Sequence, residues 1–133
     1  MLPLIVYRRP IQRRIRVARP EDKDIVTEIA NRAFAPKDRT LWINGAFGRS
    51  DRTIYVLEHY GGVQAFIIMR AEGSDWRVDL IGVNSPRLGY GRDLMKYVEY
   101  VSPVEFEELV AGTHADNDGA QQFYHSQGFA CWR

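Results

Sequence analysis

Two glycines between a strand pattern and a helical pattern are the part of this sequence best suited to binding an anion. Gly89 and Gly91 follow an apolar stretch at residues 76–83 and precede residues 92–101, where apolar side chains recur at helical spacing. Glycine lets main chain approach a ligand, and the free N–H groups of a helix's first turn attract negative charge. The pattern predicts a phosphate or pyrophosphate site at residues 88–92, although a tight strand–helix turn would look the same.

Acidic and imidazole side chains supply the candidates for proton transfer. By simple strand alternation, Asp79 lies on the same side as Ile81 and Val83. A buried carboxylate with a raised pKa would suit proton abstraction, whereas an ion pair with an arginine would make the residue structural, and both interpretations are open. His114, which follows a predicted strand, titrates near neutral pH. Weaker candidates are Glu58, His59 and a chain of water molecules to bulk solvent.

Composition is that of an ordinary globular chain. The 133 residues are 45% hydrophobic and 26% charged with a formal net charge of +1, which indicates one domain and no general attraction to nucleic acid or membranes. The single Cys131 excludes an intrachain disulfide and a cysteine-rich zinc site, and no metal is expected. No stretch suits a membrane span or secretory signal, so we expect a cytoplasmic protein. The arginine-rich residues 8–19 are either a phosphate-binding arm or an exposed strand edge.

Hydrophobic periodicity predicts the elements that would position these groups. Runs of β-branched and aromatic residues indicate strands, and apolar stripes indicate helices. The predicted order is β-α-α-β-β-β-α-β-α-β, at residues 15–18, 20–35, 39–47, 53–58, 63–71, 76–83, 92–101, 106–113, 118–127 and 129–133. Pro20 and Pro36 mark the start and end of the first helix, and Tyr60-Gly61-Gly62 marks a hairpin turn.

Three motifs in the same order resemble the GNAT superfamily of N-acetyltransferases. Residues 15–22, followed by an amphipathic helix, are similar to the family's first strand and helix. Val83 with Gly89-x-Gly91 is similar to its pyrophosphate loop, with Pro86 at the position where the family usually has Gln or Arg. The C-terminal signature is matched by Asn117, Ala120, Phe123, Tyr124, Gly128 and Phe129.

The resemblance covers residues 13–133, which would form one acetyltransferase domain, and leaves residues 1–12 as an N-terminal extension with room for an extra strand. It implies an α/β (α+β) fold in which helices flank a central mixed, mostly antiparallel sheet. The strands at residues 78–83 and 109–113 would run parallel and part at their C-terminal ends. Acetyl-CoA would enter the cleft between them.

The resemblance also implies which residues would hold acetyl-CoA. The pantetheine arm would pair with main chain near Ile81 and Val83, and Asn117 would cap the last helix and hydrogen-bond the pantetheine. Main-chain N–H groups would bind the pyrophosphate, with Arg87 as a nearby cation. The implied cofactor-binding residues are Ile81, Val83, Arg87, Leu88, Gly89, Tyr90, Gly91, Arg92, Asn117 and Tyr124.

Direct attack of an amine on the thioester is the reaction that the resemblance implies. Tyr124 occupies the position of the family's proton donor to the departing thiolate, and a phenol can donate to sulfur. Asp79 is the candidate base. The acceptor would be an amine of a small molecule or a peptide. Residues 110–114 with Asn117 are similar to a Gly-Thr-Gln stretch in members that acetylate amino sugars attached to nucleotides. The alternative is a protein of this fold that has lost catalysis and serves as a binding or structural module.

A homodimer is the last expectation. The sequence ends soon after Gly128 and Phe129, where most family members add another strand. An unpaired sheet edge invites pairing with another chain. We therefore expect either the apolar residues 2–7 or a second copy of the protein at that edge, with the second copy favoured.

Overall fold

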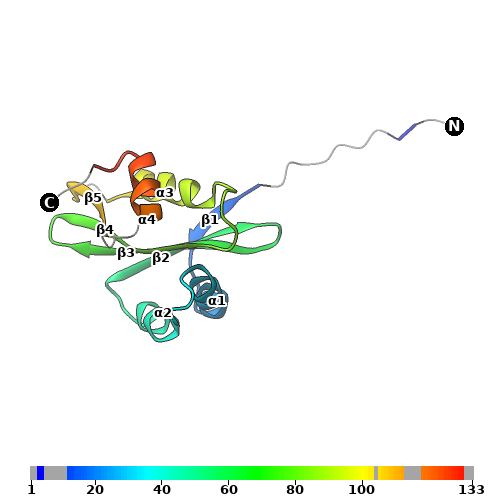
Figure 1. Ribbon diagram of the computed structural model, residues 1–133, viewed down its shortest axis with the longest axis horizontal. Coiled ribbons are helices and arrows are strands. Elements are labelled where there is room, and N and C mark those ends of the chain that lie inside the picture. The colour runs from blue at the N-terminus through cyan, green and yellow to red at the C-terminus, as the bar shows by residue number, and fades with distance from the viewer. Residues whose placement is uncertain (1–2, 5–11, 104, 113–117, 131–133) are drawn as a thin grey trace.

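Five strands form one mixed sheet in the order β1-β2-β3-β4-β5 (Figure 1). The computed structural model describes residues 3–4, 12–103, 105–112 and 118–130. Its elements are β1 (Arg14–Val17), a 3-10 turn η1 (Pro20–Asp22), α1 (Lys23–Ala33), α2 (Thr40–Phe47), β2 (Arg52–His59), β3 (Gly62–Glu72), β4 (Asp75–Val83), α3 (Tyr90–Val101), β5 (Glu108–Ala111) and α4 (Asp118–Ser126). The predicted α/β (α+β) class is confirmed, as is the predicted element order from β1 to α4.

Some predicted boundaries differ from the structure. Helix α3 begins at Tyr90, earlier than the predicted Arg92, because Gly91 is itself helical. The predicted final strand is absent at Phe129 and Ala130, and its remainder lies outside the described residues, as do all of the apolar residues 2–7 except Pro3 and Leu4. Within the described chain, no helix combines the length and apolar character needed to cross a membrane. The domain boundary at residues 12–13 stays a prediction.

Helices cover both faces of the sheet, α1 and α2 on one and α3 and α4 on the other (Figure 1). Alternate strand side chains point to opposite faces, so the central strands supply both cores. The core under α1 and α2 contains Val26, Ile29, Ala30, Ile43, Ala46, Ile54, Val56, Phe66 and Ile68. The core under α3 contains Tyr55, Leu57, Ala65, Ile67, Met69, Trp76, Val78, Tyr90, Leu94, Met95 and Val98.

Strand β4 is central to the site because it pairs along its whole length with one neighbour but only over its first part with the other. It runs antiparallel to β3 along its length but parallel to β5, which pairs with it only from Asp75 to Val78. Beyond Val78, β4 continues to Val83 with no β5 partner among the residues that the structure describes. The predicted parallel pair that parts at its C-terminal end is therefore present in the described sheet.

A bulge overturns the predicted orientation of Asp79. Met69 pairs with Val78 and Ile68 with Leu80, so Asp79 is an extra residue in the β3–β4 register. Simple alternation would place Asp79 with Ile81 and Val83, which pack against the α3 core. Its carboxylate instead meets arginines that share the α1/α2 face with Ile54 and Ile68, since an extra residue reverses the alternation.

Candidate active site

A cavity of about 510 Å³ lies where β4 parts from β5. Its lining combines residues of β4, the loop after it, α3, α4 and the end of α1: Ala33, Phe34, Asp79, Leu80, Ile81, Gly82, Val83, Ser85, Pro86, Arg87, Gly89, Tyr90, Gly91, Arg92, Gly112, Ala120, Phe123, Tyr124 and Gln127. Because α1 and α4 cover opposite faces of the sheet, the cavity is bordered from both faces.

The loop that leads from β4 into α3 is built around left-handed residues. Arg87 has φ +67° and Gly89, the N-cap of α3, has φ +81°. The first hydrogen bond of the helix runs from Asp93 N to Gly89 O at 3.0 Å. The N–H groups of Tyr90, Gly91 and Arg92 therefore precede any intrahelical acceptor. These groups border the cavity, where the helix dipole also favours an anion.

Gly91 serves a packing role in addition to the expected approach of bare backbone to a ligand. A Cβ at this position would stand 3.2 Å from two ring carbons of Phe123 on α4 and 3.9 Å from Ile81 Cδ1. The absent side chain therefore lets α4 close against the start of α3. Gly91 and Phe123 both line the cavity, so this close approach lies in its wall.

The side chain of Tyr90 points into the protein, away from a ligand. It is 2% exposed, and its hydroxyl lies 2.8 Å from Nδ1 of the buried His59. Only the main chain of Tyr90 is therefore placed to serve a cofactor. Leu88 is 48% exposed and does not line the cavity, whereas Arg87 and Arg92 do and add positive charge beside the helix start.

Arg13, which the sequence did not identify as a site residue, binds the loop between β4 and α3. Its Nη1 donates to Asp93 Oδ2 at 2.7 Å, and its Nη2 donates to the carbonyl of Leu88. The guanidinium carbon also lies 4.7 Å from the ring centre of Tyr90. Arg13 thus ties the segment before β1 to the turn between β4 and α3. An arginine-rich stretch could signal such a role, but no pattern in the sequence identifies Asp93 as the partner.

Tyr124 stands in the cavity wall as a protonated phenol. The side chain is half-buried on α4, with its ring 5.4 Å from that of Phe123 and 5.5 Å from that of Phe129. Burial raises the pKa of the Tyr124 hydroxyl to about 12, since removing water disfavours the phenolate. At neutral pH the group therefore carries the proton that a proton donor needs.

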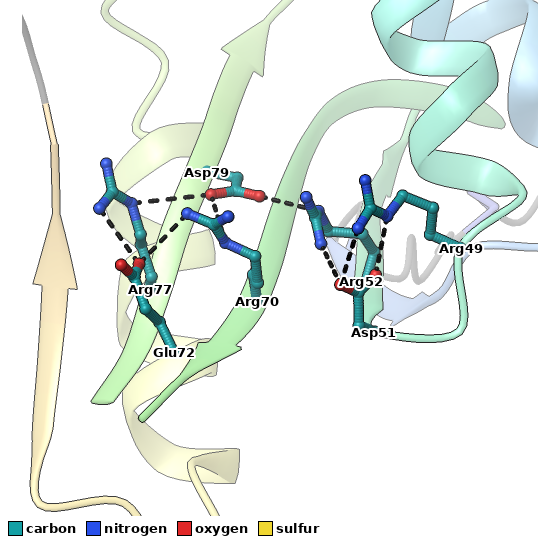
Figure 2. A network of polar contacts seen from close by, with 7 residues as sticks. All are labelled: Arg49, Asp51, Arg52, Arg70, Glu72, Arg77 and Asp79. Carbon is teal, nitrogen blue, oxygen red and sulfur yellow. Dashed lines mark hydrogen bonds and ion pairs between the residues drawn. The ribbon is translucent and has the colours of Figure 1, made fainter. Parts of the chain in front are cut away.

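Asp79 has the ion-pair arrangement, the second of the two interpretations left open by the sequence. Its Oδ2 lies 2.9 Å from Arg52 Nε, and its Oδ1 lies 3.3 Å from Arg70 Nε and 3.7 Å from Arg77 Nε (Figure 2). The carboxylate side chain is 8% exposed. The carboxylate therefore balances the charge of the guanidinium groups around it.

The other proton-transfer candidates lie away from the cavity or outside the described residues. Neither Glu58 nor His59 lines the cavity. Glu58 accepts a hydrogen bond from Arg16 Nε at 2.7 Å, and His59 is paired with Tyr90. His114 and Asn117 lie outside the described residues. No group of three His, Cys, Asp or Glu side chains suited to a metal ion occurs in the part of the chain that the structure describes.

Comparison with known proteins identifies the class. The model of the acetyltransferase (GNAT) family matches residues 20–129, so the chain belongs to this family. It is an acetyltransferase, for which acetyl-CoA is the acyl donor, and the predicted family, enzyme class and donor are confirmed. A search of curated proteins found no significant match.

Solved structures support the same fold. A possible acetyltransferase from Clostridium difficile 630 has 18% identity and a TM-score of 0.79, covering 91% of this chain and 93% of its own. The ribosomal-protein-S18-alanine N-acetyltransferase of Escherichia coli has 21% identity and a TM-score of 0.79, and the match covers 92% of this chain and 80% of that enzyme. Aminoglycoside N-acetyltransferase AAC(6')-Iy, in complex with CoA, has 12% identity and a TM-score of 0.77, with 96% and 94% covered. At these identities the likeness establishes the fold alone.

Proposed function

We propose that the protein transfers the acetyl group of acetyl-CoA directly to a primary amine, with both substrates bound at once. The observation that carries the proposal is the cavity where β4 parts from β5. The free N–H groups of α3 border this cavity, and the phenol of Tyr124 belongs to its wall. One end suits a pyrophosphate, and the wall supplies a proton donor.

Main chain would hold most of the donor. The N–H groups of Tyr90, Gly91 and Arg92 would bind the pyrophosphate, with the side chains of Arg87 and Arg92 beside it. After Val78, the edge of β4 that faces away from β3 has no strand beside it in the described sheet. Its amide and carbonyl groups near Ile81 and Val83 suit the amides of pantetheine, which would pair like an added strand.

The proposed chemistry needs a stabilised carbonyl oxygen and a proton for the leaving sulfur. The bulge takes Asp79 out of the β3–β4 ladder, directly after the last residue of β4 that pairs with β5 in the described sheet. The main-chain N–H of Asp79 is therefore a candidate donor to the thioester oxygen. Tyr124 would protonate the departing thiolate. Since Asp79 is committed to arginines, we assign the acceptor amine's proton to water and Asp79 to charge balance. Asn117 keeps its predicted role toward pantetheine as part of this proposal.

Acetyl-CoA binding and thiol release test the proposal. A ligand of the folded state raises its stability by RT ln(1 + [L]/Kd), so acetyl-CoA should raise the melting temperature. S-acetylpantetheine, which lacks the pyrophosphate, is the matched control and should give a much smaller shift. A panel of amines should then produce free CoA and an acetylated product. No thermal shift with acetyl-CoA would leave the binding-module hypothesis instead.

We also propose a homodimer. Strand β5 is an outer strand of the described sheet, with β4 on one side only. Open strand edges pair readily with other chains. A second copy at this edge would cover the main-chain groups of Glu108–Ala111 that face away from β4.

A further inference from the structure

The arginines on the α1/α2 side of the cavity point to the chemistry of the acceptor. We infer that the acceptor amine carries a nearby carboxylate or phosphate, which Arg77 binds, and this inference rests on the proposed function. The residues that carry it are Arg77, Gly112, Phe34 and Arg39, together with the network around Asp79.

The two faces of the cavity suit different substrates. The free N–H groups, Arg87 and Arg92 belong to the α3 side, where the donor would lie. Phe34, at the end of α1, borders the cavity from the other face of the sheet, onto which the bulge turns the Asp79 side chain. With the donor along β4, this α1/α2 side is the approach left for an acceptor.

Positive charge exceeds negative charge in the network on this side. Figure 2 shows guanidinium groups converging on Asp79 from three strands. Four arginines and three carboxylates make up the network: Arg49, Arg52, Arg70 and Arg77 with Asp51, Glu72 and Asp79. Asp79 is the one acidic residue among the described lining residues, and it is already paired. A cationic acceptor would therefore find no free carboxylate in this lining.

Arg77 is the arginine placed to reach an acceptor. Its Nη1 lies 3.2 Å from Glu72 Oε2 and its Nε lies 3.7 Å from Asp79 Oδ1. Its Nη2 lies beside Gly112, where a Cβ would be only 2.5 Å away. Gly112 lines the cavity and Arg77 does not, so the missing side chain of Gly112 lets the guanidinium lie directly next to the lining. The Arg77 side chain is 36% exposed, and its ion pairs within the described residues use Nη1 and Nε but not Nη2.

A second arginine, Arg39, adds positive charge next to a residue of the cavity lining. The guanidinium carbon of Arg39 lies 5.1 Å from the ring centre of Phe34, which lines the cavity. Arg39 Nε is buried and has no hydrogen-bond acceptor in the described part of the chain. A guanidinium fork such as that of Arg77 suits a carboxylate or phosphate.

Pairs of amines that differ in negative charge test the inference. Phosphoethanolamine is compared with ethanolamine, glycylglycine with its amide, and putrescine represents a cation. We expect kcat/KM for the anionic member of a pair to exceed that of its neutral partner by roughly 10- to 100-fold, as for a hydrogen bond to a charged group. The two pairs separate a phosphate preference from a carboxylate preference.

Variants assign the preference to Arg77. Arg77→Gln should abolish it by raising KM for the anionic amine, while the acetyl-CoA thermal shift and the rate with the neutral partner stay near wild type. Arg77→Lys should restore part of it. Arg49→Gln is the matched control, because Arg49 belongs to the same network but is 59% exposed and pairs with Asp51, and it should keep the preference.

The inference is overturned if kcat/KM is equal within both pairs or if no member of either pair is acetylated. It is also overturned if putrescine is the preferred acceptor, or if the Arg77→Gln variant keeps the preference for anionic amines. Absence of a thermal shift with acetyl-CoA marks failure of the proposed function instead. If Arg77→Gln fails to fold, Arg77→Lys and the wild-type preference within the two pairs decide the matter.

Discussion

Tyr124 is protonated and borders the cavity, so its hydroxyl can be removed without disturbing the donor's pyrophosphate site. Tyr124→Phe should leave acetyl-CoA affinity unchanged and lower kcat by roughly two orders of magnitude, the usual contribution of a positioned proton donor. Because burial raises the pKa of this phenol to about 12, its proton is present below that pH and is lost only above it. Turnover should therefore show no alkaline loss from this group up to about pH 10. If Tyr124→Phe keeps wild-type turnover at every pH, Tyr124 is not the proton donor and its role is packing.

Asp79 offers a test between charge balance and base catalysis. Asp79→Asn would leave Arg52, whose side chain is 9% exposed, without its buried carboxylate partner. Breaking a buried pair from one side costs about 3 kcal/mol of unfolding free energy. We expect that loss in urea denaturation, and a kcat within about tenfold of wild type with an unchanged pH–rate profile. An unaltered unfolding free energy together with a collapsed kcat would show instead that the carboxylate is the base.

Neither the orientation nor the partners of Asp79 could be predicted from sequence. Alternation assumes a regular ladder, and the bulge is a property of two strands in register, which a single strand's pattern does not contain. Arg52 and Arg70 reach Asp79 because β2, β3 and β4 are adjacent. The same limit applies to Arg13, because its partners Asp93 and Leu88 are 80 and 75 residues away along the sequence.

The elements were more predictable than these contacts because their signals are local. Helix α3 has an apolar stripe at helical spacing, with Leu94, Met95 and Val98 buried, and the turn at residues 60–62 has the glycines of a hairpin. Gly89 was recognisable as a turn residue, and its left-handed φ of +81° explains why. The role of Gly91 against Phe123 required the packing of α4, which no local signal reports.

The contact between α3 and α4 predicts how Gly91 acts. Gly91→Val would drive Cβ and its methyl groups into the Phe123 ring, so α4 should move away and the cavity should lose its shape. Acetyl-CoA affinity, measured by thermal shift or calorimetry, should fall at least about tenfold while the protein stays folded. Adding Phe123→Ala should recover part of the affinity by making room. Unchanged affinity in the single variant would exclude this end of the cavity from the donor site.

Arg13 predicts a coupling between the segment before β1 and the start of α3. Asp93 is an acid in the first turn of α3, where it would repel a pyrophosphate, and Arg13 lies 2.7 Å from it. Arg13→Gln should weaken acetyl-CoA binding by roughly fivefold, a modest effect because both side chains are about one-third exposed. Asp93→Asn in the same chain should recover much of the loss, since the repulsion goes with the charge. Additive effects in the double variant would contradict this coupling.

At the scale of the whole molecule, the described sheet has three long central strands, β2, β3 and β4, between two short outer strands, β1 and β5. Strands β2, β3 and β4 are paired along most of their length, while β5 is limited to Glu108–Ala111. That shortness lets β4 part from β5 and opens the cavity, but it also leaves an outer edge with β4 on one side only. The same feature therefore supports both the proposed site and the proposed dimer.

Removal of residues 1–7 distinguishes the two ways of covering the β5 edge. If a second copy pairs there, the shortened protein should remain a dimer of nearly unchanged stability, because the contact uses Glu108–Ala111 from each chain. If the N-terminal segment pairs there instead, the full chain should be a monomer, and the deletion should lower its unfolding free energy. Sedimentation at micromolar concentration gives the oligomeric state, and urea denaturation at two protein concentrations gives the stability, which rises with concentration only for a dimer. A monomer that tolerates the deletion would defeat both versions, since the edge would then be stable without a partner strand.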